Sequence, residues 1–176
     1  MFEDWAIIGA PFSDNDKGRA YFYRRESGAW NQHQSLQASD GSDGDKFGRS
    51  VAMRGKTMIV GAPWKDNGNG PNEGVVYVFT LQGETWKKNS KFNASDGASY
   101  DEFGSSVAIS GYTLLVGAWG KDGGKGAAYA FIFAGDVLWD EGTRLILRNG
   151  IASGDWFGSA VALSDDMALI GDRFSD

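Results

Sequence analysis

Residues 47–63 read Phe-Gly-Arg-Ser-Val-Ala-Met-Arg-Gly-Lys-Thr-Met-Ile-Val-Gly-Ala-Pro, and this stretch decides the fold. Apolar side chains alternate over residues 47–53, which predicts a strand with one buried face. A tight turn at residues 54–56 follows, and residues 57–62 form an apolar run typical of a strand buried on both faces. The stretch therefore predicts two short strands joined by a hairpin turn.

The same phrase recurs along the chain. Phe-Gly pairs begin at residues 47, 103 and 157, and a Gly-Ala-Pro triplet or a variant of it follows each pair. Residues 3–14 also align with residues 165–176, an offset of 162 residues that equals three repeats of 54. A fixed period of this length indicates a repeat architecture. We expect one array over residues 1–176, with approximate repeats at 1–45 (partial), 46–101, 102–155 and 156–176 (partial).

Each complete unit has the pattern of four antiparallel strands. In the second unit a polar, Gly-rich loop at 65–74 leads to a β-branched and aromatic strand at 75–79, a turn at 83–86 and a weaker strand near 91–93. Such units in tandem predict an all-β fold made of β-propeller blades. The expected strands total 13, or about three blades' worth. We expect the Phe of each Phe-Gly pair to pack between neighbouring blades.

The composition excludes several classes of protein. The net charge is −6 and the basic residues are scattered, so nucleic acid is not an expected partner. The chain has no cysteine and a single histidine, His33, which leaves no usual catalytic triad and no Cys-based or His-rich metal centre. No apolar run approaches the ~20 residues of a membrane span. No signal peptide is visible in this chain, so we expect either a cytosolic protein or a mature or excised piece.

The repeated phrases resemble the FG-GAP repeat, the unit of the integrin α-subunit propeller and of many secreted propellers. The matching motifs are residues 47–52 with 60–63, residues 103–108 with 116–119, and residues 157–162. The resemblance implies a non-enzymatic propeller, extracellular or on the cell surface, that acts in adhesion, ligand binding or cell-surface structure.

Integrin-type repeats often carry a calcium loop between their first two strands, and this chain departs from that pattern. The corresponding connections are residues 54–56, 110–112 and 164–166, and the first of them is basic. Connections this short do not supply the about 6–8 oxygen ligands that Ca²⁺ takes. The calcium site of those relatives is therefore not expected here.

Other loops are richer in oxygen ligands and carry a separate calcium hypothesis. Their side-chain oxygens alternate along the chain and precede glycine, in partial resemblance to a calcium loop. The candidate ligands are Asp14, Asp16, Asp66, Asn67 and Asn69. Asp, Asn and Gly are also the residues that turns require, which is the alternative interpretation. No other cofactor is expected.

Tryptophan supplies the candidate ligand-binding residues. Trp30, Trp86 and Trp139 recur once per repeat, which favours a structural role. Trp64 and Trp119 stand beside the Gly-Ala-Pro position, near a loop end, where flat aromatic rings could stack on sugars. A further candidate site is Asn93, which begins the one Asn-X-Ser glycosylation pattern.

About three blades do not close a ring, because propellers have roughly 4–8 blades. The remaining blades are expected to come from the same, longer protein or from other copies of the chain. The leading hypothesis is a non-enzymatic, extracellular or cell-surface propeller segment for adhesion or protein interaction. The alternatives are a self-assembling fibre or ring subunit and a lectin-like carbohydrate binder, so the expected partners are further blades and a protein or glycan ligand.

Overall fold

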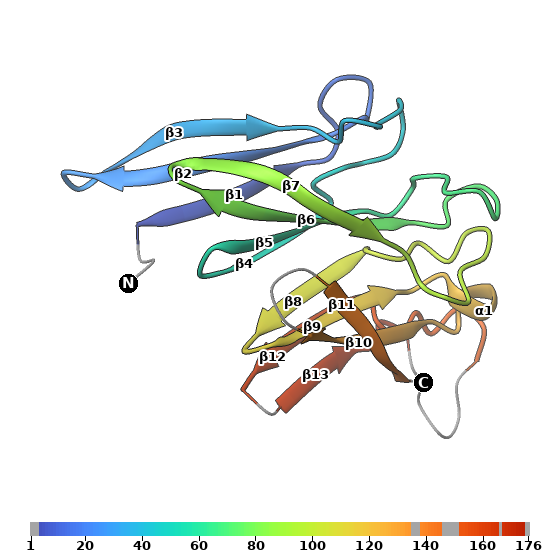
Figure 1. The fold of residues 1–176 in the computed structure, drawn as a ribbon. Coiled ribbons are helices and arrows are strands. Elements are labelled where there is room, and N and C mark those ends of the chain that lie inside the picture. The colour runs from blue at the N-terminus through green and yellow to red at the C-terminus, as the bar shows by residue number, and fades with distance from the viewer. Residues whose placement is uncertain (1–3, 135–137, 146–151, 166, 175–176) are drawn as a thin grey trace.

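The structure is a computed structural model, and it describes residues 4–134, 138–145, 152–165 and 167–174. The regular secondary structure of the described residues is almost entirely antiparallel β-strand, in four sheets (Figure 1). The first sheet holds β1 (Trp5–Ala10), β2 (Arg19–Glu26) and β3 (Ala29–Leu36). The second holds β4 (Ser50–Arg54), β5 (Thr57–Ala62), β6 (Val75–Gln82) and β7 (Thr85–Phe92).

The third sheet repeats the second, and the fourth begins another copy. The third contains β8 (Ser106–Ser110), β9 (Thr113–Ala118), β10 (Ala127–Ala134) and β11 (Leu138–Leu145). A single irregular turn, α1 (Lys121–Gly124), lies in its β9–β10 loop, with left-handed φ values of 53° at Asp122 and 72° at Gly123. The hairpin of β12 (Ala160–Ser164) and β13 (Met167–Gly171) forms the fourth sheet. The described residues thus form 13 strands, which confirms the predicted propeller blades.

Two predicted strand boundaries were wrong. The strand expected at residues 47–53 begins only at Ser50, because Gly48 has a φ of 88° and turns the chain into the blade. The weak strand expected near residues 91–93 is the eight-residue β7, which begins at Thr85, so the turn is shorter than predicted. The division into repeats stays a prediction, although each sheet lies within one expected repeat.

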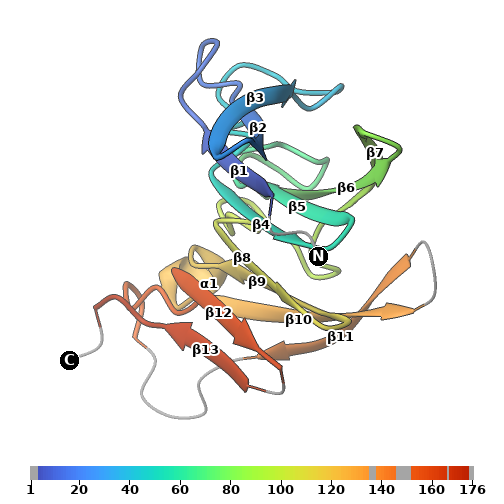
Figure 2. The same ribbon diagram turned by 90° about the vertical axis from the view of Figure 1, so that its left-hand side faces the viewer.

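The blades pack with β4, β8 and β12 side by side, along what would be the axis of the propeller (Figure 2). Glycine permits this approach: a Cβ on Gly61 would overlap the carbonyl oxygen of Gly104 in the next blade, and Gly117 meets Gly158 in the same way. Gly171, the equivalent in β13, has ordinary clearance. The predicted role of glycine in blade crowding is therefore confirmed for the two inner copies.

Aromatic residues fill the space between blades, as predicted. Phe47 is fully buried and its ring lies 5.4 Å from that of Tyr77, in a cluster that also contains Phe22 of the preceding blade. Phe103 repeats this contact with Tyr129, at 5.5 Å between ring centroids. The core thus consists of successive interfaces between blades.

The recurring tryptophans are not equivalent in the structure. Trp86 is 1% exposed and stacks on Phe22 of the preceding blade, with ring centroids 5.1 Å apart. Trp30, at the same position of the first blade, is 48% exposed because no described residues cover that face. The structural role predicted for both is confirmed only for Trp86. The side chain of Trp139 lies outside the described part of the chain.

Candidate functional site

The blades have two different ends. One end, here called the hairpin end, carries the short β4–β5 and β8–β9 turns. The opposite end, here called the loop end, carries the longer loops that join second to third strands and one blade to the next (Figure 1). The sequence-predicted ligand residues Trp64 and Trp119 both lie at the loop end.

A repeated backbone conformation places three unlike side chains at the loop end. Lys46, Glu102 and Trp156 each precede a Phe-Gly pair and adopt left-handed φ values of 56°, 54° and 61°. In each case the backbone N–H donates to a carbonyl of the second-to-third-strand loop of the preceding blade, at 2.8–3.1 Å. Non-glycine residues in this region cost energy and are found where the surroundings hold them.

Glu102 is the centre of the site. Its carboxylate lies near the indoles of Trp64 and Trp119, which come from adjacent blades. Burial raises the pKa of Glu102 above its ordinary value, while the nearby indole N–H groups and the charges of Arg49 and Lys46 act in the opposite direction. The two tryptophans were predicted from the sequence, whereas no sequence pattern marks the carboxylate near them.

An aromatic and cationic row extends from this centre on both sides. The Lys46 ammonium lies 3.6 Å from the ring centroid of Trp64 and 4.5 Å from that of Phe12. On the other side Trp119 packs on Trp156, with ring centroids 4.6 Å apart. Cation–π contacts of this kind hold both partners in place.

A hollow of about 130 Å³ lies beside Trp119 and Trp156. Its lining residues are Arg49, Ser105, Trp119, Trp156, Ser159 and Arg173. The guanidinium carbon of Arg173 lies 5.5 Å from the centroid of Trp156 and 5.3 Å from that of Phe174. The lining therefore combines two guanidinium groups with two indole walls.

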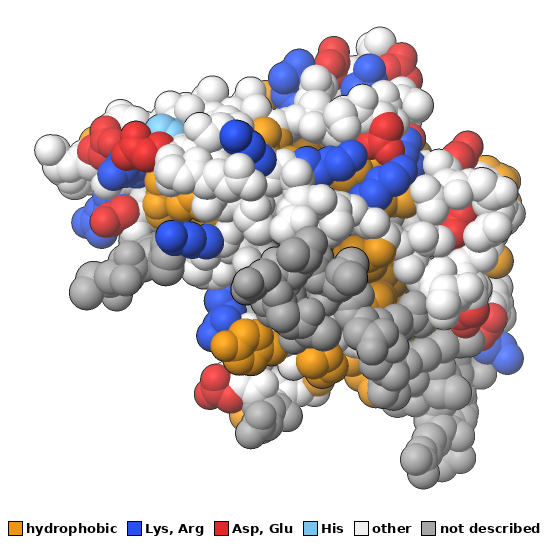
Figure 3. All heavy atoms as spheres, in the orientation of Figure 1, with side chains coloured by type: hydrophobic (Ala, Val, Ile, Leu, Met, Phe, Trp, Pro, Cys, Tyr) orange, Lys and Arg blue, Asp and Glu red, His pale blue; other side chains and the backbone are white. Residues whose placement is uncertain are grey.

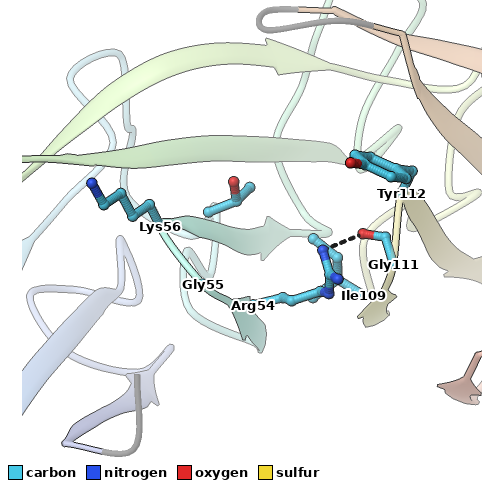
Figure 4. Close-up of a pocket in the computed structure, with 7 residues that line it drawn as sticks. Arg54, Gly55, Lys56, Ile109, Gly111 and Tyr112 are labelled. Carbon is cyan, nitrogen blue, oxygen red and sulfur yellow. Dashed lines mark hydrogen bonds between the residues drawn. The ribbon is translucent and has the colours of Figure 1, made fainter. Parts of the chain in front are cut away.

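The hairpin end also has a hollow, of about 200 Å³, but its polar groups do not converge. Arg54 donates to the Gly111 carbonyl at 2.8 Å, whereas Lys56 extends away from Arg54 (Figure 4). Tyr112 lies at its rim and is 69% exposed. This end therefore supplies matched control positions for experiments on the loop end.

The predicted calcium ligands have protein partners. Asp14 accepts from Gln37 at 2.7 Å and from Arg19 at 3.3 Å, and the Gln37 hydrogen bond is the main cause that lowers its pKa. Asp16 lies 3.8 Å from the Lys46 ammonium.

The second predicted loop is held in the same way. Asp66 accepts from the Asn72 N–H at 2.8 Å, and the Asn69 amide donates to Glu73 at 3.0 Å. Asn67 is half-buried in the same loop. Within the described residues no group of three or more His, Cys, Asp or Glu is placed to hold a metal ion. Calcium binding stays a prediction.

Lysine ammonium groups occupy the Asp-rich loops between blades. Lys121 pairs with Asp101 at 2.9 Å and also donates to the Asp96 carbonyl, with both side chains of the pair 5% exposed. Lys65 repeats the arrangement with Asp45 at 3.0 Å, between side chains 8% and 7% exposed. These two ion pairs bind each loop to the blade that follows it.

A tyrosine reinforces each of these connections. Tyr77 donates to Asp40 at 3.0 Å, and Tyr129 donates to Asp96 at 2.8 Å. Burial raises the pKa of Asp40, but the hydrogen bonds from Lys91 and Tyr77 outweigh it and lower the value to about 2. The acidic loops are thus part of the blade contacts.

Asn93 is part-buried, and its amide nitrogen donates to Glu73 at 2.6 Å and to the Ala94 carbonyl at 3.2 Å. A glycan on this nitrogen would replace one of the two donated hydrogens. Glycosylation at Asn93 stays a prediction.

Comparisons with known proteins agree with this architecture. The FG-GAP repeat family matches residues 30–79, 86–131 and 139–176, which is more than half of the chain. Integrin alpha-2 of Mus musculus is 32% identical over 108 residues, covering 54% of this chain and 9% of that protein. Integrin alpha-2 of Bos taurus is 32% identical over 87 residues, covering 43% of this chain and 7% of that protein.

The chain therefore spans less than a tenth of these relatives. Proteins of this kind are in general non-enzymatic and take part in adhesion or protein interaction. No helix among the described residues is long and apolar enough to cross a membrane. The repeated Phe-Gly and Gly-Ala-Pro motifs, the four-stranded antiparallel sheets and the family match together show that this chain belongs to the FG-GAP repeat family.

Proposed function

We propose that this chain is part of an extracellular or cell-surface propeller that binds a partner protein through its loop end, in an adhesive role. The observation that carries the proposal is the row of aromatic and charged side chains at the loop end, in which Lys46 contacts Trp64, Trp119 packs on Trp156, and Glu102 lies near both Trp64 and Trp119. Exposed aromatic side chains continue the row, since Phe12 is 68% and Phe174 is 52% exposed. Aromatic residues of this kind are enriched among those that dominate the energy of protein interfaces.

The geometry supports a protein partner more than a glycan. One face of Trp64 contacts the Lys46 ammonium, and Trp119 packs on Trp156, so both rings already use a face for contacts within the molecule. Figure 3 shows Lys and Arg side chains interspersed with Asp and Glu on the visible face. At the loop end itself, Lys46 and Glu102 place both signs of charge beside Trp64. Charged groups around an aromatic residue suit an interface whose specificity comes from charge complementarity.

The test is adhesion of cells of the source organism to surfaces coated with the chain. The double variant Phe12→Ala/Trp64→Ala removes two exposed aromatic rings of the loop end. We expect it to lose most adhesion, because removing anchor residues costs about 2 kcal/mol or more, equivalent to roughly 30-fold in affinity. Tyr112→Ala, an exposed aromatic residue at the hairpin end, is the control and keeps adhesion. Equal loss in both variants would place the partner elsewhere.

Self-assembly through uncovered blade faces is a second candidate, favoured by one comparison between equivalent positions. Trp30 is 48% exposed where Trp86 is 1% exposed, and Leu169 is 73% exposed where Ile59 is fully buried. The face that carries Trp30 and the face that carries Leu169 correspond to the two sides of an internal blade interface. The Leu169 face of one copy could therefore pack against the Trp30 face of another.

Light scattering tests this candidate. Assembly predicts a mass that rises above 19.0 kDa with concentration and falls back in Trp30→Asp and Leu169→Asp but not in Tyr112→Asp. A constant monomer mass at millimolar concentration would rule self-assembly out.

A further inference from the structure

We propose that the hollow at the loop end beside Trp119 and Trp156 accepts the carboxylate of one Asp or Glu side chain from the partner protein. This inference rests on the proposed function and names the chemistry of its contact.

The lining carries an excess of positive charge. The six lining residues include Arg49 and Arg173 and no carboxylate. Glu102 lies near Arg49, and Lys46 acts on that carboxylate while also pairing with Asp16 at 3.8 Å. These two carboxylates and the three cations, Arg173 included, still sum to one positive charge. Positive charge gathered at one place on a chain of net charge −6 attracts an anion.

The repeat shows that the first arginine is a local addition. Arg49 follows its Phe-Gly pair directly, and the two equivalent positions hold Ser105 and Ser159. The two serines donate to the Gly117 and Gly171 carbonyls, at 3.1 and 3.5 Å, so their hydrogens are already engaged. The guanidinium groups are therefore the charged donors in the lining that a carboxylate would meet, and they can bind it through two parallel N–H groups.

The walls and the size select a single side chain. Trp119 and Trp156 are tilted by 47° and line the hollow with aromatic surface, against which the methylene groups of Asp or Glu can pack. A volume of about 130 Å³ is small beside the about 300–1,000 Å³ of typical small-molecule pockets. An amino-acid side chain fits this space better than a saccharide.

The experiment is an NMR titration of the 176-residue chain with N-acetyl-glutamate N-methylamide, followed at the indole N–H signals of Trp119 and Trp156. We expect saturable shifts of both signals and no shift with the matched glutamine derivative. Arg173→Gln and Arg49→Gln should each weaken binding roughly tenfold, as expected for loss of a charged hydrogen bond. Arg54→Gln, at the hairpin end, should leave the binding unchanged.

Two further arms decide the ligand class and the role of geometry. Arg173→Lys keeps the positive charge but loses the paired N–H donors of the guanidinium group. This variant should bind the glutamate derivative more weakly than the unmodified chain and more tightly than Arg173→Gln. Glucuronate that shifts both signals while the glutamate derivative does not would overturn the assignment to a protein side chain. Absence of any shift with the glutamate derivative would also overturn it. If adhesion still depends on Phe12 and Trp64 in that case, the proposed function stands and only the carboxylate pocket falls.

Discussion

Replacement of Lys121 by methionine tests the contact that joins the second and third blades. The Lys121 ammonium lies 2.9 Å from the Asp101 carboxylate, and both side chains are 5% exposed. Methionine keeps most of the apolar volume and removes the charge. Within the described part of the chain, the hydrogen bond from the Ala98 N–H, at 2.8 Å, would then be what remains to compensate the buried charge of Asp101.

The magnitude follows from the burial of both partners. Removing one member of a buried ion pair costs about 3–5 kcal/mol, because the other charge stays in a medium that solvates it poorly. Lys121→Met should therefore lower the free energy of unfolding by about that amount. Adding Asp101→Asn removes the stranded charge while leaving an oxygen to accept from the backbone, so the double variant should recover part of the loss.

Urea unfolding followed by circular dichroism gives the free energies of the four proteins in this cycle. Lys125→Met is the matched control, because the Lys125 side chain is exposed in the same loop, and we expect a change within about 0.5 kcal/mol. A loss below about 1 kcal/mol for Lys121→Met, or no recovery in the double variant, would refute the reasoning that this ammonium is a buried blade connection.

Three further predictions concern the blades. Gly61→Ala should lower the thermal midpoint far more than Gly171→Ala, because a Cβ at Gly61, unlike one at Gly171, overlaps backbone of the next blade; equal effects would contradict the blade packing. Trp86→Ala should lower the free energy of unfolding, measured with denaturant, by about 3–5 kcal/mol. Trp30→Ala should lower it clearly less, because that ring is 48% exposed. The pKa of Asp40 in the folded chain, about 2, lies below its ordinary 3.8. The stabilisation that the ionised Asp40 gives the folded state is complete above about pH 4 and is lost as the pH falls towards 2. Asp40→Asn should therefore reduce the dependence of the free energy of unfolding on pH between about 4 and 2.

The fold was predictable because the same strand and turn motifs occur in several repeats. One Phe-Gly pair alone is weak, but three pairs in register with Gly61 and Gly117 define the blade period. Strand limits were less predictable, since the entry into β4 depends on the left-handed conformation of Gly48, which is imposed by the neighbouring blade. The buried pairs also had a usable signal: Lys65 and Lys121 occupy equivalent positions, as do Asp45 and Asp101.

The site was only partly predictable. Trp64 and Trp119 stood out as aromatic residues near loop ends, but Glu102 had no counterpart to mark it. Lys46 and Trp156 hold the equivalent positions, so charge and size change from blade to blade while the backbone conformation is retained. Motifs that recur in every repeat are easily recognised, whereas the side chains of this site differ from one blade to the next.

The titration of Glu102 is the most direct test of the account, because it reports whether loops of adjacent blades converge at the loop end. The indole N–H signals of Trp64 and Trp119 should move together with pH, with one shared midpoint above the ordinary Glu value of 4.5. Glu102→Gln should abolish both movements. Independent behaviour of the two indoles, or no response of either one in the unmodified chain, would contradict the convergence on which the proposed function depends.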